Sequence, residues 1–190
     1  MFLVYGSGMS DDPSSKARIL GAAAAVVDRS GAAHLTIDAV AAEAKLSKGG
    51  VLYHFPNKRS MLEGMVKHVL ARTAERTAKH RAEIHEGRNV ALRSLILSEQ
   101  EQDEFEQGMS LAILAAAAED PDLLAPAREA VAAWFEEVRA ENSGDPLGAL
   151  LLLATEGMRF LGMLNLLPMS VAEREQIHQK LLSIAEAGTL

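Results

Sequence analysis

The chain has 190 residues, 48% of them hydrophobic, which is enough for one substantial core or for two smaller cores that share an interface. It has no cysteine, which excludes disulfide frameworks, thiolate metal sites and cysteine nucleophiles. The net charge of −7 is unevenly spread: residues 1–81 carry 12 Lys and Arg against 7 Asp and Glu, whereas residues 82–190 carry 7 against 19, so the N-terminal part suits a polyanion unless the bias is accidental.

The first 13 residues are predicted to be a disordered lead-in to the folded chain. Their apolar stretch is short and no basic residue precedes it, so it lacks the pattern of a secretory signal, and either Met1 or Met9 can be the native start. No apolar run in the chain approaches the roughly 20 residues that a membrane-spanning helix needs. We therefore expect a cytoplasmic protein that has no membrane partner.

Three short helices are predicted to follow. The spacing of apolar residues places them over 14–29, over 37–44 and from residue 47 to just before Pro56. Thr36 and Ser47 can act as N-caps of the second and third helices. Only the three residues 45–47 separate these two helices, and so tight a turn between short helices predicts a helix-turn-helix.

The remainder of the chain is predicted to be helical throughout. Its apolar residues keep a helical spacing, interrupted by acidic breaks and by breaks that contain Pro or Gly. The expected helices run over 57–84, 89–99, 102–119, 121–141, 146–165 and 170–186. No alternating pattern suggests a strand. The predicted fold is all-α with about nine helices, divided into a helix-turn-helix domain over 14–56 and a larger helical bundle over 57–190.

The stretch KLSKGGVLYHFPNK, residues 45–58, concentrates positive charge in an otherwise acidic chain. Lys48 lies at the start of the third helix, where unpaired N–H groups and the helix dipole suit a phosphate, and a guanine edge is the alternative partner. Gly49 and Gly50 each destabilise a helix by about 1 kcal/mol relative to alanine. Close approach of a DNA duplex to the helix would explain both glycines, because a side chain would hold the helix out of the major groove.

This part of the sequence resembles a known family. The segment LTIDAVAAEAKLSKGGVLYHFPNKRSML, residues 35–62, closely resembles the DNA-binding region of the tetracycline-repressor (TetR) family of bacterial transcription regulators. The likeness extends back through ARILGAAAAVVDRSG, so that it covers about residues 16–62. A capped helix, a turn, a Ser-Lys-Gly start, an aromatic-His-Phe end, a proline and an Asn-Lys opening occur in the family's order. The C-terminal two-thirds matches the family only in helix count and length.

The resemblance implies roles in DNA binding for eight residues. They are Thr36, Tyr53, His54 and Lys58 as phosphate anchors, and Ser47, Lys48, Gly49 and Gly50 at the helix start that enters the major groove. From the residues alone, a core ring is an equally good interpretation for Tyr53, and a helix C-cap for His54. Leu52 departs from the pattern, because many members have a tyrosine there. Phe55 is expected to pack this module onto the fourth helix.

The resemblance also implies that residues 14–56 form the DNA-binding domain and that residues 57–190 form the ligand-binding and dimerisation domain. It further implies a ligand-released repressor that acts as a homodimer on an inverted-repeat operator. Double-stranded DNA, a second copy of the chain and a small-molecule effector are the expected partners, and neither a metal nor a cofactor is implied. The helix over 146–165 is apolar on two faces, which suggests one cover from its own domain and one from a partner subunit, although a central position in a monomeric bundle is the alternative. The predicted interface comprises Leu150, Leu153, Gly157, Phe160, Leu161, Ile177, Leu181 and Ile184.

The helices over 102–119 and 121–141 are expected to line an effector site. The candidate residues, each of which is also a good core residue, are Phe105, Met109, Ile113, Trp134, Phe135, Met158 and Arg159. An aromatic content of 4% favours an aliphatic cavity with a few polar groups. The acidic run over 98–108 is interpreted as a solvated helix start, with attraction of a cationic ligand as the alternative.

Two other functional classes remain open at this point. A helical adaptor, or a protein that coats DNA with little specificity, would show steep salt dependence without sequence preference. An enzyme would need a polar constellation that the chain lacks. His80 and His85 do not have the spacing of a metalloprotease helix, and no phosphate-binding loop or nucleophile elbow is present, so we expect no enzymatic activity.

Overall fold

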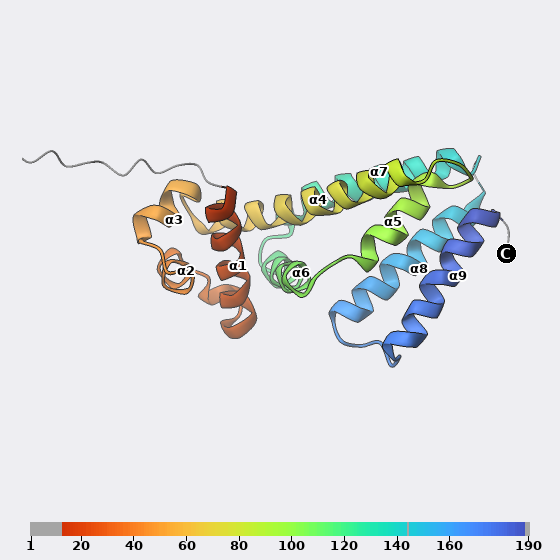
Figure 1. Cartoon of the computed structure of the whole chain (residues 1–190). Coiled ribbons are helices and arrows are strands. Elements are labelled where there is room, and N and C mark those ends of the chain that lie inside the picture. The colour runs from red at the N-terminus through yellow and green to blue at the C-terminus, as the bar shows by residue number, and fades with distance from the viewer. Residues whose placement is uncertain (1–12, 144, 189–190) are drawn as a thin grey trace, which may run out of the picture.

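The computed structural model describes residues 13–143 and 145–188, and these residues form an all-α protein (Figure 1). The prediction of about nine helices is confirmed for this part of the chain. Most of the predicted lead-in, residues 1–12, lies outside the described residues. None of the helices within 13–143 and 145–188 is both long enough and apolar enough to cross a membrane.

The predicted helix boundaries lie within two or three residues of the observed ones, with one exception. The helices are α1 (Pro13–Ser30), α2 (Ile37–Ala44), α3 (Lys48–His54), α4 (Lys58–Glu83), α5 (Val90–Gln100), α6 (Glu104–Ala117), α7 (Ala125–Glu141), α8 (Pro146–Met163) and α9 (Val171–Ala187), with short 3-10 turns η1 (Ala32–His34) and η2 (Pro121–Leu124). The helix predicted over 121–141 is divided into η2 and α7. Pro126 explains the division, because proline fits the first turn of a helix but disrupts its interior.

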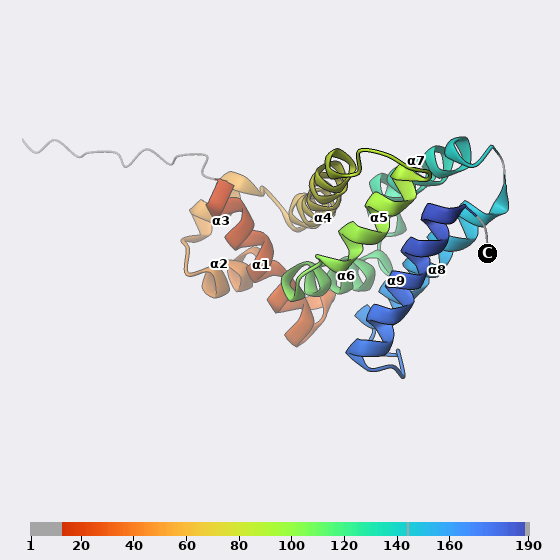
Figure 2. The same cartoon turned by 45° about the vertical axis from the view of Figure 1, so that its right-hand side comes forward.

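A first hydrophobic core joins α1, α2 and α3 to the start of α4 and to α6 (Figure 2). The helices in this core pack closely where they cross. A Cβ atom on Gly64 of α4 would lie 2.6 Å from the ring of Phe55, and one on Gly21 of α1 would lie 2.4 Å from the ring of Phe105 on α6. The prediction that Phe55 packs the N-terminal module onto the fourth helix is therefore confirmed, and α6 is a second support for that module.

A second hydrophobic core lies at the other end of the molecule. It is formed by α5, α7, α8 and α9, with Leu92, Ile96, Val138 and Leu152 fully buried at its centre. The helices α8 and α9 lie side by side at this end, and α4 runs from the N-terminal module toward it (Figures 1 and 2). Between the two cores, α4, α5 and α6 meet.

A buried ion pair holds α4, α5 and α6 together at this meeting point. The Glu106 side chain is 1% exposed, and its two carboxylate oxygens accept from Arg76 Nη1 at 2.7 and 2.6 Å. Arg76 Nε donates to the carbonyl oxygen of Ser98 near the end of α5 at 3.0 Å, and Arg72 Nε donates to Glu106 at 2.9 Å. A buried charge is tolerated only when it is paired and hydrogen-bonded, so this arrangement fixes the three helices relative to one another.

We predict that Glu106→Gln lowers the free energy of unfolding by about 3 kcal/mol, because it leaves Arg76 buried without its counter-charge. Glu75→Gln is the matched control: the Glu75 carboxylate also contacts Arg72, at 3.4 Å, but it is largely exposed and should contribute little. Urea denaturation followed by circular dichroism measures both variants. Equal losses in the two variants would contradict a special role for the buried pair.

Candidate functional site

The helix α3 presents one face to the protein and another to solvent. Val51 is fully buried and Phe55, at the C-cap, is buried as well. The outward face carries Lys48, Gly49, Leu52 and Tyr53, of which Tyr53 is 53% exposed. Lys48 and Leu52 lie one helical turn apart, as do Gly49 and Tyr53, so the four residues form a single surface that begins at the N-terminus of α3.

The caps predicted for α2 and α3 are confirmed. The Thr36 hydroxyl oxygen accepts from the backbone N–H of Ala39 at 3.1 Å, and the Ser47 hydroxyl oxygen accepts from the backbone N–H of Gly50 at 3.0 Å. Lys45 ends α2 in the left-handed conformation, with a φ of 55°, and so permits the tight turn into α3. Backbone N–H groups at both helix starts therefore lie on the exposed side of the module.

Gly49 of α3 has no internal packing reason to be glycine, whereas a side chain on Gly50 would crowd the hydroxyl that caps the helix. The nearest atom to a Cβ built on Gly49 is the Ser47 hydroxyl oxygen at 4.0 Å, and for Gly50 the same oxygen lies at 3.3 Å. Because glycine weakens a helix interior by about 1 kcal/mol relative to alanine, an external reason for the missing side chain of Gly49 is favoured. A surface that approaches the backbone of α3 from outside would supply that reason.

The cations of the module differ in their availability. Lys48 Nζ lies 2.9 Å from the carboxylate of Asp38 on α2, but both side chains are largely exposed, so the pair is weak and can exchange for another anion. Lys58 Nζ instead donates to the carbonyl oxygen of Ala32 at 2.7 Å and lies 4.0 Å from Glu119. The predicted phosphate anchor Lys58 is thus engaged inside the protein in this conformation. The His54 ring lies edge-on to the Tyr53 ring, with centroids 5.0 Å apart.

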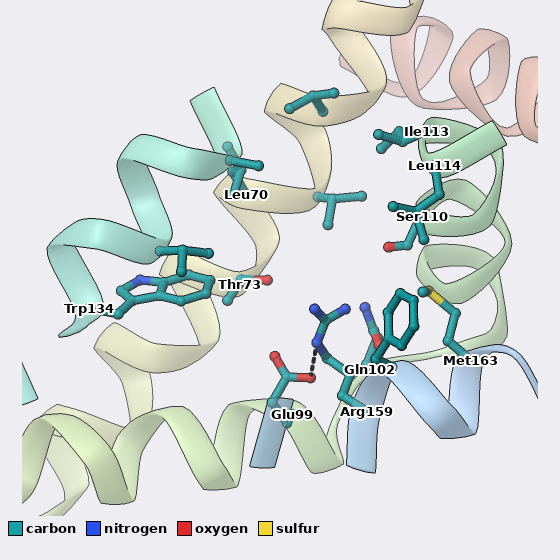
Figure 3. A pocket seen from close by; sticks show the side chains of 15 residues that line it. Leu70, Thr73, Glu99, Gln102, Ser110, Ile113, Leu114, Trp134, Arg159 and Met163 are labelled. Carbon is teal, nitrogen blue, oxygen red and sulfur yellow. Dashed lines mark ion pairs between the residues drawn. The ribbon is translucent and has the colours of Figure 1, made fainter. Parts of the chain in front are cut away.

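A second candidate site is a cavity of about 150 Å³ between α4, α6, α7 and α8 (Figure 3). Most of its wall is apolar and comes from residues such as Leu70, Ile113, Leu114 and Trp134. Polar groups gather at one end, where Glu99 from the end of α5, Gln102 and Arg159 lie together. A largely apolar cavity with a few convergent polar groups is the usual form of a small-molecule site.

The polar end of the cavity contains an incompletely satisfied carboxylate. Arg159 donates to Glu156 from Nε at 3.0 Å and from Nη2 at 2.8 Å. Glu99 Oε2 lies 3.3 Å from the same Nε, within ion-pair distance, but it is buried and accepts no hydrogen bond from the described residues. Burial is the main cause that raises the pKa of Glu99 to about 7, partly offset by the charge of Arg159.

The structure brings together only part of the predicted effector site. Ile113, Trp134 and Arg159 line the cavity. Phe105, Met109 and Phe135 do not: Phe105 packs against α1, Met109 is buried in the first core, and Phe135 packs against the second core. Met158 also packs against the second core, and it lines an adjoining compartment that shares Glu99 and Arg159 with the cavity. The prediction missed the polar lining residues Thr73, Glu99, Gln102 and Ser110.

A signal for the buried acids was present in the sequence. Leu92, Leu95, Ile96 and Glu99 follow the spacing i, i+3, i+4, i+7, so Glu99 occupies the buried stripe of α5. Glu106 occupies the first position of the corresponding stripe of α6. The interpretation of 98–108 as a uniformly solvated helix start was therefore wrong for these two residues.

The residues predicted for a dimer interface fall into two groups. On α8, Leu150, Leu153, Phe160 and Leu161 are exposed in the single chain and Gly157 is partly exposed. On α9, Leu181 is 7% exposed and belongs to the second core, which Ile177 and Ile184 also pack against. The apolar face of α9 covers its own protomer, because α5 and α8 lie against it. Leu181 is accordingly a core residue rather than a surface one.

The raised pKa of Glu99 predicts a pH-dependent stability difference. An acid whose pKa is higher in the folded state than in the unfolded state stabilises the fold fully below the unfolded value, here 4.5, and this contribution is lost as the pH rises through about 7. Glu99→Gln removes the titration, so its stability relative to wild type should increase by roughly 1–3 kcal/mol between pH 5 and pH 8. Denaturant unfolding at both pH values, with Glu75→Gln as the control, measures this difference. A difference that is the same at both pH values would contradict the prediction.

Comparison with known proteins agrees with this arrangement. A family model described as bacterial regulatory proteins, tetR family, matches residues 19–65. A second model, described as tetracyclin repressor-like, C-terminal domain, matches residues 89–186, which is more than half of the chain. The two matches together cover the helix-turn-helix surface and most of the cavity wall.

Individual relatives are more distant. The HTH-type transcriptional regulator BetI of Burkholderia thailandensis is 31% identical over 81 residues, a match that spans 43% of this chain and 42% of BetI. The structure of a transcriptional regulator from Rhodococcus sp. Rha1 is 19% identical, with a TM-score of 0.66 over 92% of this chain and 97% of that one. A member of the TetR family from Streptomyces coelicolor A3 is 24% identical, with a TM-score of 0.62 over 89% and 98%. The two structures share the fold, and the family models identify the relationship: the chain belongs to the tetracycline-repressor (TetR) family of bacterial transcriptional regulators.

Proposed function

We propose that the chain is a ligand-released repressor that binds an inverted-repeat operator as a homodimer. Regulators of this family bind DNA and small-molecule effectors and typically dimerise. In the proposed division, residues 14–56 contact DNA and residues 57–190 bind the effector and the partner subunit. The observation that carries the proposal is the outward face of α3, where Gly49, which has no internal packing reason to be glycine, stands beside an exposed lysine and an exposed tyrosine.

The face of α3 has the chemistry of a major-groove reader. Lys48 can exchange Asp38 for a phosphate or a guanine edge, and the Tyr53 hydroxyl can donate to a phosphate oxygen. Leu52, where many members have tyrosine, offers an apolar contact for a thymine methyl group instead. In a homodimer the two α3 helices would read half-sites about one helical turn apart, or a modest extension of it.

The helix α6 is the proposed route from effector to DNA. Ile113 of α6 lines the cavity and also belongs to the core that holds the DNA-binding module. Beyond the end of α6, Asp120 accepts from Arg59 Nη1 at 2.8 Å at the start of α4. A ligand that shifts α6 would thus move α1 and the start of α4, and with them the spacing between the two recognition helices. Release follows only if the ligand binds the shifted state more tightly.

The exposed leucines of α8 support the homodimer. Leu150, Leu153, Gly157 and Leu164 recur at intervals of three, four and seven residues, so they form one apolar stripe along the helix. Exposed apolar stripes of this kind are typical of helix-to-helix subunit interfaces. The opposite face of α8 is already buried against the second core, where Leu151 and Leu152 lie.

Selection of the purified protein on random and genomic DNA fragments at near-physiological salt tests the proposal. We expect enrichment of an inverted repeat, and Gly49→Ala should weaken binding to it while raising the free energy of unfolding by up to about 1 kcal/mol. Ala133→Gly, at an exposed position within α7, is the reciprocal control: it should lower stability and leave DNA affinity unchanged. Retention without sequence enrichment would favour a DNA-coating protein instead.

The dimer prediction can be checked at one residue of the α8 stripe. Leu153→Glu should convert the dimer to a monomer and abolish specific DNA binding, whereas the monomer should stay folded because this side chain is 59% exposed. Analytical ultracentrifugation and circular dichroism separate these effects. Leu52→Glu, the same change on the exposed face of α3, should impair DNA binding but leave the dimer intact. A Leu153→Glu dimer of unchanged affinity would place the interface elsewhere.

A further inference from the structure

The carboxylate of Glu99 is the group in the cavity whose bonding the protein leaves incomplete. Its side chain is 8% exposed and its Oε2 has no hydrogen-bond donor among the described residues. Arg159 cannot supply one from Nε, because the single hydrogen on that nitrogen is already donated to Glu156. A buried acceptor without a donor destabilises the protein, so a bound molecule that donates to Glu99 removes that cost.

The charges around Glu99 come from four helices. On α4 and α6, Arg72 and Arg76 both donate to Glu106. On α8, Glu156 takes both hydrogen bonds of Arg159. The other two groups, Arg174 and His178 on α9, line an adjoining polar compartment of about 180 Å³ that shares Glu99 with the apolar cavity. In that compartment Arg174 Nε is also buried without a hydrogen-bond partner among the described residues. The charged groups that line the apolar cavity are Glu99 and Arg159, and the one with the incomplete bonding is Glu99.

We infer that the effector is a monocation with an apolar body, whose positively charged N–H group donates to Glu99 Oε2 while the body fills the apolar cavity. This inference rests on the proposed effector role of the cavity. A cation supplies the missing hydrogen bond and a counter-charge beside the Glu99 carboxylate together, whereas a neutral donor supplies only the hydrogen bond and an anion is repelled by the carboxylate. Arg174 and His178 line the adjoining compartment and disfavour a cation there, so the cationic end of the ligand stays beside Glu99.

The cavity also limits the body of this molecule. A volume of about 150 Å³ lined by apolar side chains holds a group the size of a benzene ring. The adjoining compartment, lined by Gln100, Gln102 and Gln107, leaves room for a polar extension past Glu99. A protonated benzylic amine or an aryl amidinium is therefore a suitable probe, and larger amines extend the series.

The affinity of such a cation should increase with pH in the neutral range. The cation needs ionised Glu99, and burial raises the pKa of this carboxyl to about 7. The ionised fraction rises about tenfold between pH 6 and pH 8, and the affinity of a cation that binds only the ionised form rises by the same factor. A neutral ligand of the same shape should show no such rise.

Matched pairs of ligands test the inference on the full-length protein. Isothermal titration calorimetry would compare amines protonated at the working pH with alcohols and carboxylates of the same carbon skeleton, from one ring to three rings. We expect the cation to bind at least tenfold more tightly than its alcohol in wild type, and this preference to disappear in Glu99→Gln. Glu104→Gln, which removes an exposed carboxylate at the start of α6 outside the cavity, should keep the preference.

Three outcomes would overturn the inference. They are equal or tighter binding of the alcohols or carboxylates, a cation preference that survives in Glu99→Gln, and the absence of binding by every cation in the series. Adding the same ligands to the complex with the selected DNA separates this inference from the proposed function. If a cation binds but does not release the DNA, the effector role of the cavity is overturned and the cation preference stands. If neutral or anionic ligands release the DNA and cations do not, the choice of a cation is overturned and the effector role is supported.

Discussion

The buried contact between Glu106 and Arg76 is the interaction on which the arrangement of the two cores depends. It is the place where α4, α5 and α6 meet, and each of these helices continues into a different part of the molecule. A carboxylate that is 1% exposed tolerates little displacement, because any lost hydrogen bond leaves a buried charge. The cavity is built partly from the same three helices, so its wall next to this contact is held in place, and a ligand that shifts α6 must act further along the helix, toward Ile113.

Much of the N-terminal module could be predicted from the sequence, because its information is local. Caps, a tight turn and apolar spacing all act within a few residues, so the positions of Thr36, Ser47 and the bounds of α2 followed directly. The division of 121–141 was missed although Pro126 marks it. The engagement of Lys58 with Ala32 was not predictable, because it joins residues 26 positions apart through the fold.

The cavity was less accessible to prediction than the DNA-facing helix. Large apolar residues at helical spacing can face a core or a cavity, and only tertiary packing separates Ile113 and Trp134 from Met109 and Phe135. The polar lining was missed for another reason. Glu99 lies in an acidic run, and this composition indicated an exposed side chain. Its spacing from Leu95 and Ile96 places it in the apolar stripe of the helix, and this spacing correctly indicates burial.

Ile113 belongs both to the cavity wall and to the first core, and this constrains how the protein can change over evolutionary time. Because the side chain lines the cavity and also fills the core under α1, a substitution that reshapes the cavity there also disturbs the packing of the DNA-binding module. Substitutions of cavity residues that lie away from that core, such as Trp134 and Gln102, leave the packing of the DNA-binding module unchanged. New ligand preferences should therefore arise first on the α7 and α8 side of the cavity, and the α6 wall should diverge more slowly.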